Sequence, residues 1–167
     1  LLFSTSVYAQ AGGKGEGRRV LKINEMTKDD KAALYREAAH EKNLELIAMY
    51  EETLANPEIE GDKRAELIFR LAEKYFEEGR YFHFQEMEAY QVKFDECFNT
   101  KGCDTNKMKP DNKKSRSWQK KAITSYQGVL KDYPRYPRAD EVLFYLGSAL
   151  LEVKKPDKAV KMFHRLT

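Results

Sequence analysis

Two cysteines are the residues of this chain best suited to chemistry. Cys97 and Cys103 are the only cysteines in the sequence, with a short polar stretch between them. In an exported chain, a single close pair of this kind is expected to form one disulfide that closes a small loop. A zinc site would need further ligands, and no histidine lies near either cysteine. Two independent free thiols are the alternative if the chain is not exported.

The other groups that could support catalysis are scattered along the chain. His40, His83 and His164 fall in different predicted helices, and none belongs to an HExxH zinc motif. No G-x-S-x-G nucleophile motif occurs, and neither cysteine has a nearby histidine to activate it. The adjacent pairs Glu51–Glu52 and Glu77–Glu78 point in different directions around a helix, as solvated charge does. We therefore predict that the chain is not an enzyme and has no catalytic, cofactor-binding or metal-binding residue.

A glycine-rich stretch precedes the predicted helices. The first six of residues 12–26 include four glycines, and basic and acidic side chains lie between and after them. A phosphate-binding loop requires Lys followed by Ser or Thr, whereas Lys14 is followed by Gly15. The stretch is therefore predicted to be a flexible linker.

The first residues indicate export. Residues 1–11 are apolar and uncharged, and they end in Ala9-Gln10-Ala11, which matches the end of a secretory signal peptide. An ordinary apolar N-terminal strand is the alternative. No cysteine stands at the proposed cleavage site for lipid attachment, and no run reaches the roughly 20 apolar residues of a membrane-spanning helix. We expect a soluble periplasmic protein that does not span a membrane.

The charge of the whole chain is nearly balanced. Its 167 residues include 30 basic and 27 acidic side chains, which leaves a net charge of +3. That excess is too small to indicate nucleic acid as a partner. One Trp, 10 Tyr and 9 Phe supply enough apolar area for a compact fold.

A basic cluster stands out from this balance between residues 101 and 121. Such a cluster attracts an anionic partner, such as an acidic protein face, a peptidoglycan carboxylate or a lipid headgroup. The alternative is solvated charge that compensates the acidic helix over residues 86–96. The predicted basic patch consists of Lys107, Lys109, Lys113, Lys114, Arg116, Lys120 and Lys121.

Helical periodicity dominates the chain after the linker. The segment Thr27–Asp30 has the spacing of a capping box, so a helix is predicted from Thr27 to about Leu54. Further helices are predicted from Asp62, as N-cap, to about Phe98, from Ser115 or Ser117 to Tyr133, from Ala139 to about Val153, and from Pro156 onward. No stretch has the alternation of a β-hairpin, so the fold class is all-α.

The segment from Asp62 to Phe98 is unusually long for one helix. Its apolar residues keep one face in register, and Gly79 is the only helix breaker within it. A single glycine costs only about 1 kcal/mol in a helix, whereas a turn normally contains several breakers. We therefore predict one long helix in preference to two hairpinned ones, followed by an irregular loop that contains the cysteines.

The last helices repeat an earlier pattern. Leu146-Gly147, Leu150, Ala159 and Phe163 have the spacing of the tetratricopeptide pattern L-G-x2-Y, then Ala, then x3-F. One unit earlier, Ala122 and Tyr126 match the small residue and the ring. The two units are offset by 37 residues rather than the usual period of about 34.

These residues resemble the tetratricopeptide repeat family in its longer-period bacterial envelope form. The segments 86–90, 118–123 and 133–141, together with the cysteine pair, are also similar to periplasmic tetratricopeptide proteins of adventurous gliding motility in deltaproteobacteria. The resemblance implies a solenoid of antiparallel helix pairs. Residues 27–114 would form degenerate repeats and the cysteine loop, and residues 115–167 would form repeat units, the last truncated. The repeat-packing residues would be Ala122, Tyr126, Leu146, Gly147, Ala159 and Phe163.

The resemblance also implies a function and a surface that binds a partner. The first helix of each tetratricopeptide unit lines a groove, which places Glu141, Phe144, Ser148 and Leu151 as candidate groove residues. Phe144 and Leu151 could instead be core residues. The implied function is a non-catalytic periplasmic scaffold that binds other envelope proteins, with gliding motility machinery the preferred setting. The alternatives are a factor that coordinates cell-wall or outer-membrane assembly, and an accessory domain of a larger enzyme.

Overall fold

The fold is all-α, as predicted. The computed structural model describes residues 26–166, and within that range it contains no strand. The predicted signal peptide (1–11) and nearly all of the predicted linker (12–26) lie outside the described residues. The helices are α1 (Lys28–Ala55), α2 (Gly61–Phe98), α3 (Lys113–Asp132), α4 (Ala139–Glu152) and α5 (Pro156–Phe163), and a 3-10 turn, η2 (Thr105–Lys107), lies between α2 and α3.

The chain separates into two compact units, residues 1–41 and residues 42–167. The described part of the first unit is the beginning of α1, and the predicted capping box forms there. The Thr27 hydroxyl accepts a hydrogen bond from the Asp30 amide, and the Asp30 carboxylate accepts one from the Thr27 amide, each at 3.1 Å. This reciprocal pair satisfies backbone groups that a helix start otherwise leaves without partners.

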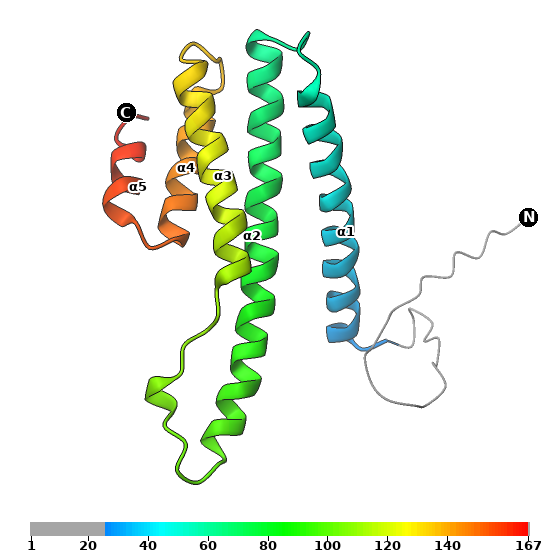
Figure 1. Ribbon diagram of the computed structural model, residues 1–167, viewed down its shortest axis with the longest axis vertical. Coiled ribbons are helices and arrows are strands. Elements are labelled where there is room, and N and C mark those ends of the chain that lie inside the picture. The colour runs from blue at the N-terminus through cyan, green and yellow to red at the C-terminus, as the bar shows by residue number, and fades with distance from the viewer. Residues whose placement is uncertain (1–25, 167) are drawn as a thin grey trace, which may run out of the picture. The chain divides into compact units, whose positions relative to one another are not determined.

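The second unit is a series of helices that reverse direction at each connection. Figure 1 shows α2 and α3 running antiparallel side by side, with α4 and α5 forming the next hairpin. The connections after α1, α2 and α3 contain what the sequence analysis expects to end a helix, namely Asn56-Pro57, the cysteine loop and Tyr133-Pro134. The tight link before α5 places Lys154 in the left-handed region, with φ of 58°.

The long helix α2 is unbroken from Gly61 to Phe98. It begins one residue before Asp62, with Glu60 in the N-cap position and no side-chain cap, so the prediction of Asp62 as N-cap is wrong. Gly79 lies inside the helix and faces α3. A Cβ atom at this position would lie 2.8 Å from Cγ of Gln119, so the glycine permits a close approach of the two helices.

The core of the second unit is aromatic at its centre. Phe69 of α2 and Tyr126 of α3 are fully buried, with their ring centroids 6.0 Å apart. Tyr145 of α4 completes the cluster, 5.8 Å from Phe69 and stacked 6.2 Å from Tyr126. Three consecutive helices therefore meet at one set of rings, which fixes their positions relative to each other.

Within the described residues, no helix combines the length and apolar character that crossing a membrane requires.

Candidate functional site

The four candidate groove residues lie along one face of α4. Their spacing of three and four positions places them in a row on a helix, and we call this row the α4 face. Phe144 is 53% exposed and Leu151 is 49% exposed, so neither is a core residue. The Ser148 hydroxyl donates to the Phe144 carbonyl within its own helix, at 3.0 Å.

A hollow of about 340 Å³ opens at the N-terminal end of the α4 face. We call it the α4 hollow, and its lining residues are Asp140, Glu141, Phe144, Tyr145 and Leu166. The hollow thus joins two of the candidate groove residues, Glu141 and Phe144, while Ser148 and Leu151 are not part of its lining. Its wall combines carboxylates with aromatic and aliphatic side chains, a mixture suited to an amphipathic side chain.

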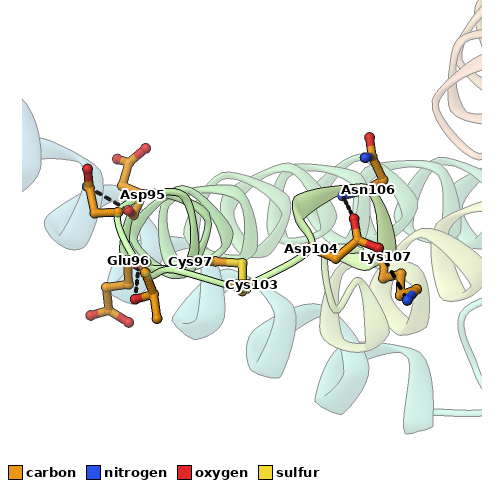
Figure 2. The surroundings of a disulfide bond; sticks show 9 residues. Asp95, Glu96, Cys97, Cys103, Asp104, Asn106 and Lys107 are labelled. Atoms are coloured by element: carbon orange, nitrogen blue, oxygen red, sulfur yellow. Dashed lines mark hydrogen bonds and ion pairs between the residues drawn. A yellow bond between two sulfur atoms is a disulfide. The ribbon is translucent and has the colours of Figure 1, made fainter.

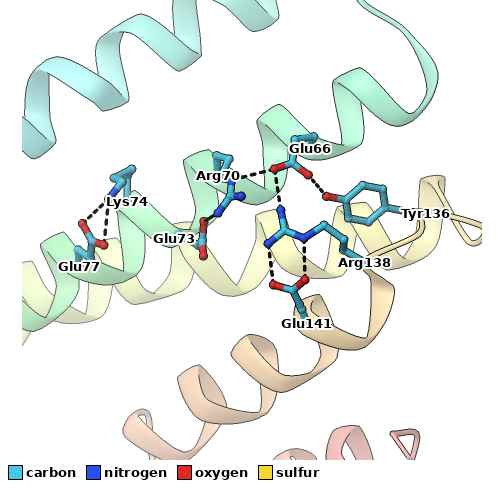
Figure 3. Close-up of polar contacts among 8 residues, drawn as sticks. All are labelled: Glu66, Arg70, Glu73, Lys74, Glu77, Tyr136, Arg138 and Glu141. Carbon is cyan, nitrogen blue, oxygen red and sulfur yellow. Dashed lines mark hydrogen bonds and ion pairs between the residues drawn. The ribbon is translucent and has the colours of Figure 1, made fainter.

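Glu141 is held in place by a network of charged side chains that connects α2 to α4 (Figure 3). The Arg138 guanidinium donates two hydrogen bonds to the Glu141 carboxylate, at 2.7 and 2.6 Å, and a third to Glu66 at 2.7 Å. The Tyr136 hydroxyl also donates to Glu66. Arg70 donates to Glu66 at 2.8 Å and to Glu73 at 2.9 Å. The network contains three carboxylates and two guanidinium groups, so it has an excess of negative charge.

The network changes the acidity of its carboxyl groups. Hydrogen bonds from Arg138 hold the pKa of Glu141 below its ordinary value. Partial burial raises the pKa of Glu66, but hydrogen bonds from Tyr136 and Arg138 and the nearby positive charges outweigh it, so the net shift is downward. Both groups are therefore charged at neutral pH, and Glu141 lines the α4 hollow as one half of an ion pair with Arg138.

The six repeat-packing residues lie at helix contacts. Ala122, Tyr126, Leu146 and Ala159 are at most 1% exposed. Gly147 faces the ring of Phe163 on α5, and a Cβ atom at Gly147 would lie 2.6 Å from Cζ of that ring. The absent side chain at Gly147 is therefore what allows the α5 ring to lie against α4.

The hydroxyl of Tyr126 has no hydrogen-bond partner among the described residues, although the side chain is fully buried. Burial, followed by the charge of Glu73, raises the pKa of this hydroxyl, so it stays neutral. An orphaned buried hydroxyl is costly and is uncommon in native proteins.

The cysteine pair lies where α2 ends (Figure 2). Cys97 and Cys103 are at disulfide distance, with their Cα atoms 5.4 Å apart. Cys97 is buried and Cys103 is exposed. The following turn η2 is capped by Asp104, whose carboxylate accepts from the Asn106 amide at 3.1 Å. The cysteine pair and the Asp104 cap therefore both help to hold the connection after α2 in place.

The residues of the predicted basic patch are exposed, and four of them contact neighbouring side chains. Lys114 lies over the Phe82 ring, 5.4 Å from its centroid, and Lys121 lies 4.5 Å from the Trp118 centroid. Lys107 and Lys113 pair with nearby aspartates at 3.2 and 3.4 Å. Three further basic side chains of the predicted patch are exposed: Lys109, Arg116 and Lys120.

Sequence reasoning missed the structural roles of two carboxylates. Glu86 of α2 caps α3, because its carboxylate accepts from the amides of Lys114 and Ser115 at 2.8 and 3.3 Å. Glu78 is 1% exposed, so the prediction of solvated charge at Glu77–Glu78 is wrong for Glu78. Its carboxylate accepts a hydrogen bond from the Asn43 side chain at 2.8 Å.

In the part of the chain that the structure describes, no group of three or more histidine, cysteine or carboxylate side chains is placed to hold a metal ion.

Comparisons with known proteins assign no relative to this chain. No family model, no curated protein and no solved structure matches it.

Proposed function

We propose that this chain is a non-catalytic tetratricopeptide scaffold that binds another envelope protein through the α4 face. The exposure of Phe144 and Leu151 on a helix that is otherwise packed into the core is the observation that carries the proposal. Large apolar side chains that stay exposed beside a hollow are typical of a surface that binds a partner. The antiparallel hairpins and the contact between Gly147 and Phe163 support the repeat assignment.

The proposed compartment is the periplasm. The cysteine pair at disulfide distance supports it, because such pairs persist in oxidising compartments. The proposed setting is an envelope-spanning complex of the gliding motility type, which rests on the sequence resemblance.

The test is capture from the solubilised envelope of the organism that encodes the chain. Wild-type chain and the double variant F144A/L151A are immobilised in parallel, and retained proteins are identified by mass spectrometry. We expect at least one envelope protein to be retained by the wild type and lost from the double variant. The variant T124A/Q127A, altered at exposed positions of α3, is the matched control and should retain it. Identical retention by all three chains would contradict the proposal.

A second candidate is a factor that binds the cell wall, because exposed cations on α3 favour an anionic surface. Arg116 and Lys120 are exposed side chains four positions apart on that helix. Co-sedimentation with purified sacculi tests this candidate. Binding that is lost in R116E/K120E but kept in F144A/L151A would favour the cell-wall function over the scaffold.

A further inference from the structure

The α4 hollow combines negative charge with exposed aromatic surface. Two of its five lining residues, Asp140 and Glu141, are carboxylates, and none of the five is a cation. Arg138 pairs with Glu141 at 2.6 Å and balances its charge. The network that contains this pair nevertheless has three carboxylates against two guanidinium groups, so together with the exposed Asp140 this end of α4 keeps an excess of negative charge.

The aromatic part of the hollow is built from two rings that meet edge to face. The centroids of Phe144 and Tyr145 are 5.7 Å apart with an interplanar angle of 80°. Phe144 is half exposed and lines the hollow. Aromatic faces attract cations as well as apolar groups.

Acidic residues at the start of α4 also have a purely structural use. Asp140 and Glu141 stand in the first turn of the helix, where negative charge is favourable. That role explains the carboxylates but not the exposed ring beside them.

We infer that the partner segment bound at the α4 hollow is basic: it presents a lysine or arginine side chain to the exposed Asp140, next to an apolar side chain on Phe144. This inference rests on the proposed function and names the chemistry of the partner. The long aliphatic stem of lysine or arginine covers the ring while its charged end reaches the Asp140 carboxylate. Binding of this kind is weakened by salt, because the carboxylate of Asp140 is exposed.

The experiment uses peptides selected from a random display library on the intact chain. Selected peptides are synthesised with a fluorophore, and their affinities are measured by fluorescence anisotropy on the wild type, F144A, D140K and D132K. Asp132 is also an exposed aspartate and is the last residue of α3, so D132K is the matched control. Circular dichroism verifies that each variant keeps the wild-type helix content.

We expect the selected peptides to share a lysine or arginine next to a large apolar residue. Both F144A and D140K should weaken binding on the order of tenfold, while D132K leaves it unchanged. Replacing the shared cation of the peptide with glutamate should restore binding to D140K and abolish it on the wild type.

The alternative outcomes separate this inference from the proposed function. Peptides that depend on Phe144 but share no cation, and that bind D140K and wild type equally, would overturn the inference and leave the proposed function standing. A selection without any Phe144-dependent peptide would overturn both. Self-association of the wild type that F144A abolishes would identify a second copy of the chain as the occupant and overturn the inference.

Discussion

Single residues set how closely the helices approach each other. Gly147 faces the Phe163 ring, and Gly79 faces the side chain of Gln119, so a methyl group at either site would meet atoms of the neighbouring helix. Gly128 of α3 is different, because a Cβ atom there would have no neighbour within 4 Å. The chain therefore offers a matched pair of helical glycines, one packed and one open.

Replacing Gly147 with alanine should destabilise the second unit, whereas the same change at Gly128 should not. The added methyl group at position 147 displaces the Phe163 ring and costs about 1–3 kcal/mol of unfolding free energy. At position 128 the better helix propensity of alanine stabilises by up to about 1 kcal/mol. Urea unfolding followed by circular dichroism measures both. Equal effects at the two sites would contradict the contact between α4 and α5.

A buried polar pair joins α1 to α2. The Asn43 amide donates to the Glu78 carboxylate at 2.8 Å and to the Lys74 carbonyl at 2.9 Å. Both side chains are nearly inaccessible to water, at 6% and 1% exposed. Because both side chains are buried, losing either hydrogen bond leaves a polar group without that partner and costs free energy.

Replacing Asn43 with alanine should therefore lower the free energy of unfolding by about 1–3 kcal/mol, because a buried carboxylate and a carbonyl both lose a donor. Thermal unfolding measures the change. The control is Gln127→Ala on α3, an exposed position whose substitution should stay within about 0.5 kcal/mol. If N43A were as mild as the control, the pair would contribute nothing to stability.

At the scale of elements, α3 depends on α2 for its start. The side chain of its N-cap Asn112 makes no capping hydrogen bond. Asp111 accepts from the Lys113 amide at 3.3 Å, and Glu86 accepts the next two amides from the neighbouring helix. The negative charge of Glu86 also faces the positive end of the α3 dipole. One carboxylate thus fixes both the beginning of α3 and its register against α2.

Replacing Glu86 with alanine should cost about 0.5–2 kcal/mol and loosen the first turn of α3. Hydrogen exchange should then accelerate at the amides of Lys114 and Ser115, with α2 unaffected. Glu96→Ala, at an exposed position of the same helix, is the control. Unchanged exchange at both amides would show that the cap is not needed.

For the molecule as a whole, local sequence patterns predict the elements well. The capping box at Thr27, the prolines after α1 and α3, and the unbroken apolar register of α2 each act within a few residues. The predicted helix ends agree closely with the structure for that reason, although α3 begins at Lys113 rather than at Ser115 or Ser117.

Contacts between distant segments are what local patterns miss. Glu78 is buried because Asn43, 35 residues earlier, lies against it, and no spacing rule encodes that pairing. The contacts of Lys114 and Lys121 with the rings of Phe82 and Tyr75 on α2 could not be predicted from local spacing either. The sequence predicts that the candidate groove residues share one face of a helix. It does not predict the network around Glu141, because that network depends on Glu66 of α2 lying next to the start of α4.

The network of Glu66, Arg138 and Glu141 makes the stability of the second unit depend on pH. Glu66 has a folded pKa below its ordinary value of 4.5. A carboxyl group of this kind stabilises the fold above its unfolded pKa, and the contribution is lost as the pH falls through the folded pKa. The contribution of Glu66 is therefore complete at neutral pH and disappears in acid.

Replacing Glu66 with glutamine should lower the melting temperature by roughly 2–4 °C at neutral pH, because the charged hydrogen bonds to Tyr136 and Arg138 are weakened. The difference between wild type and E66Q should shrink as the pH falls below 4.5, since the wild-type carboxylate becomes protonated there. Scanning calorimetry over a pH series measures the difference in melting temperature between wild type and E66Q. Glu52→Gln, at an exposed position of α1, should give no such trend. A difference that stays constant with pH would mean that the ionised form of Glu66 does not hold α2 to α4.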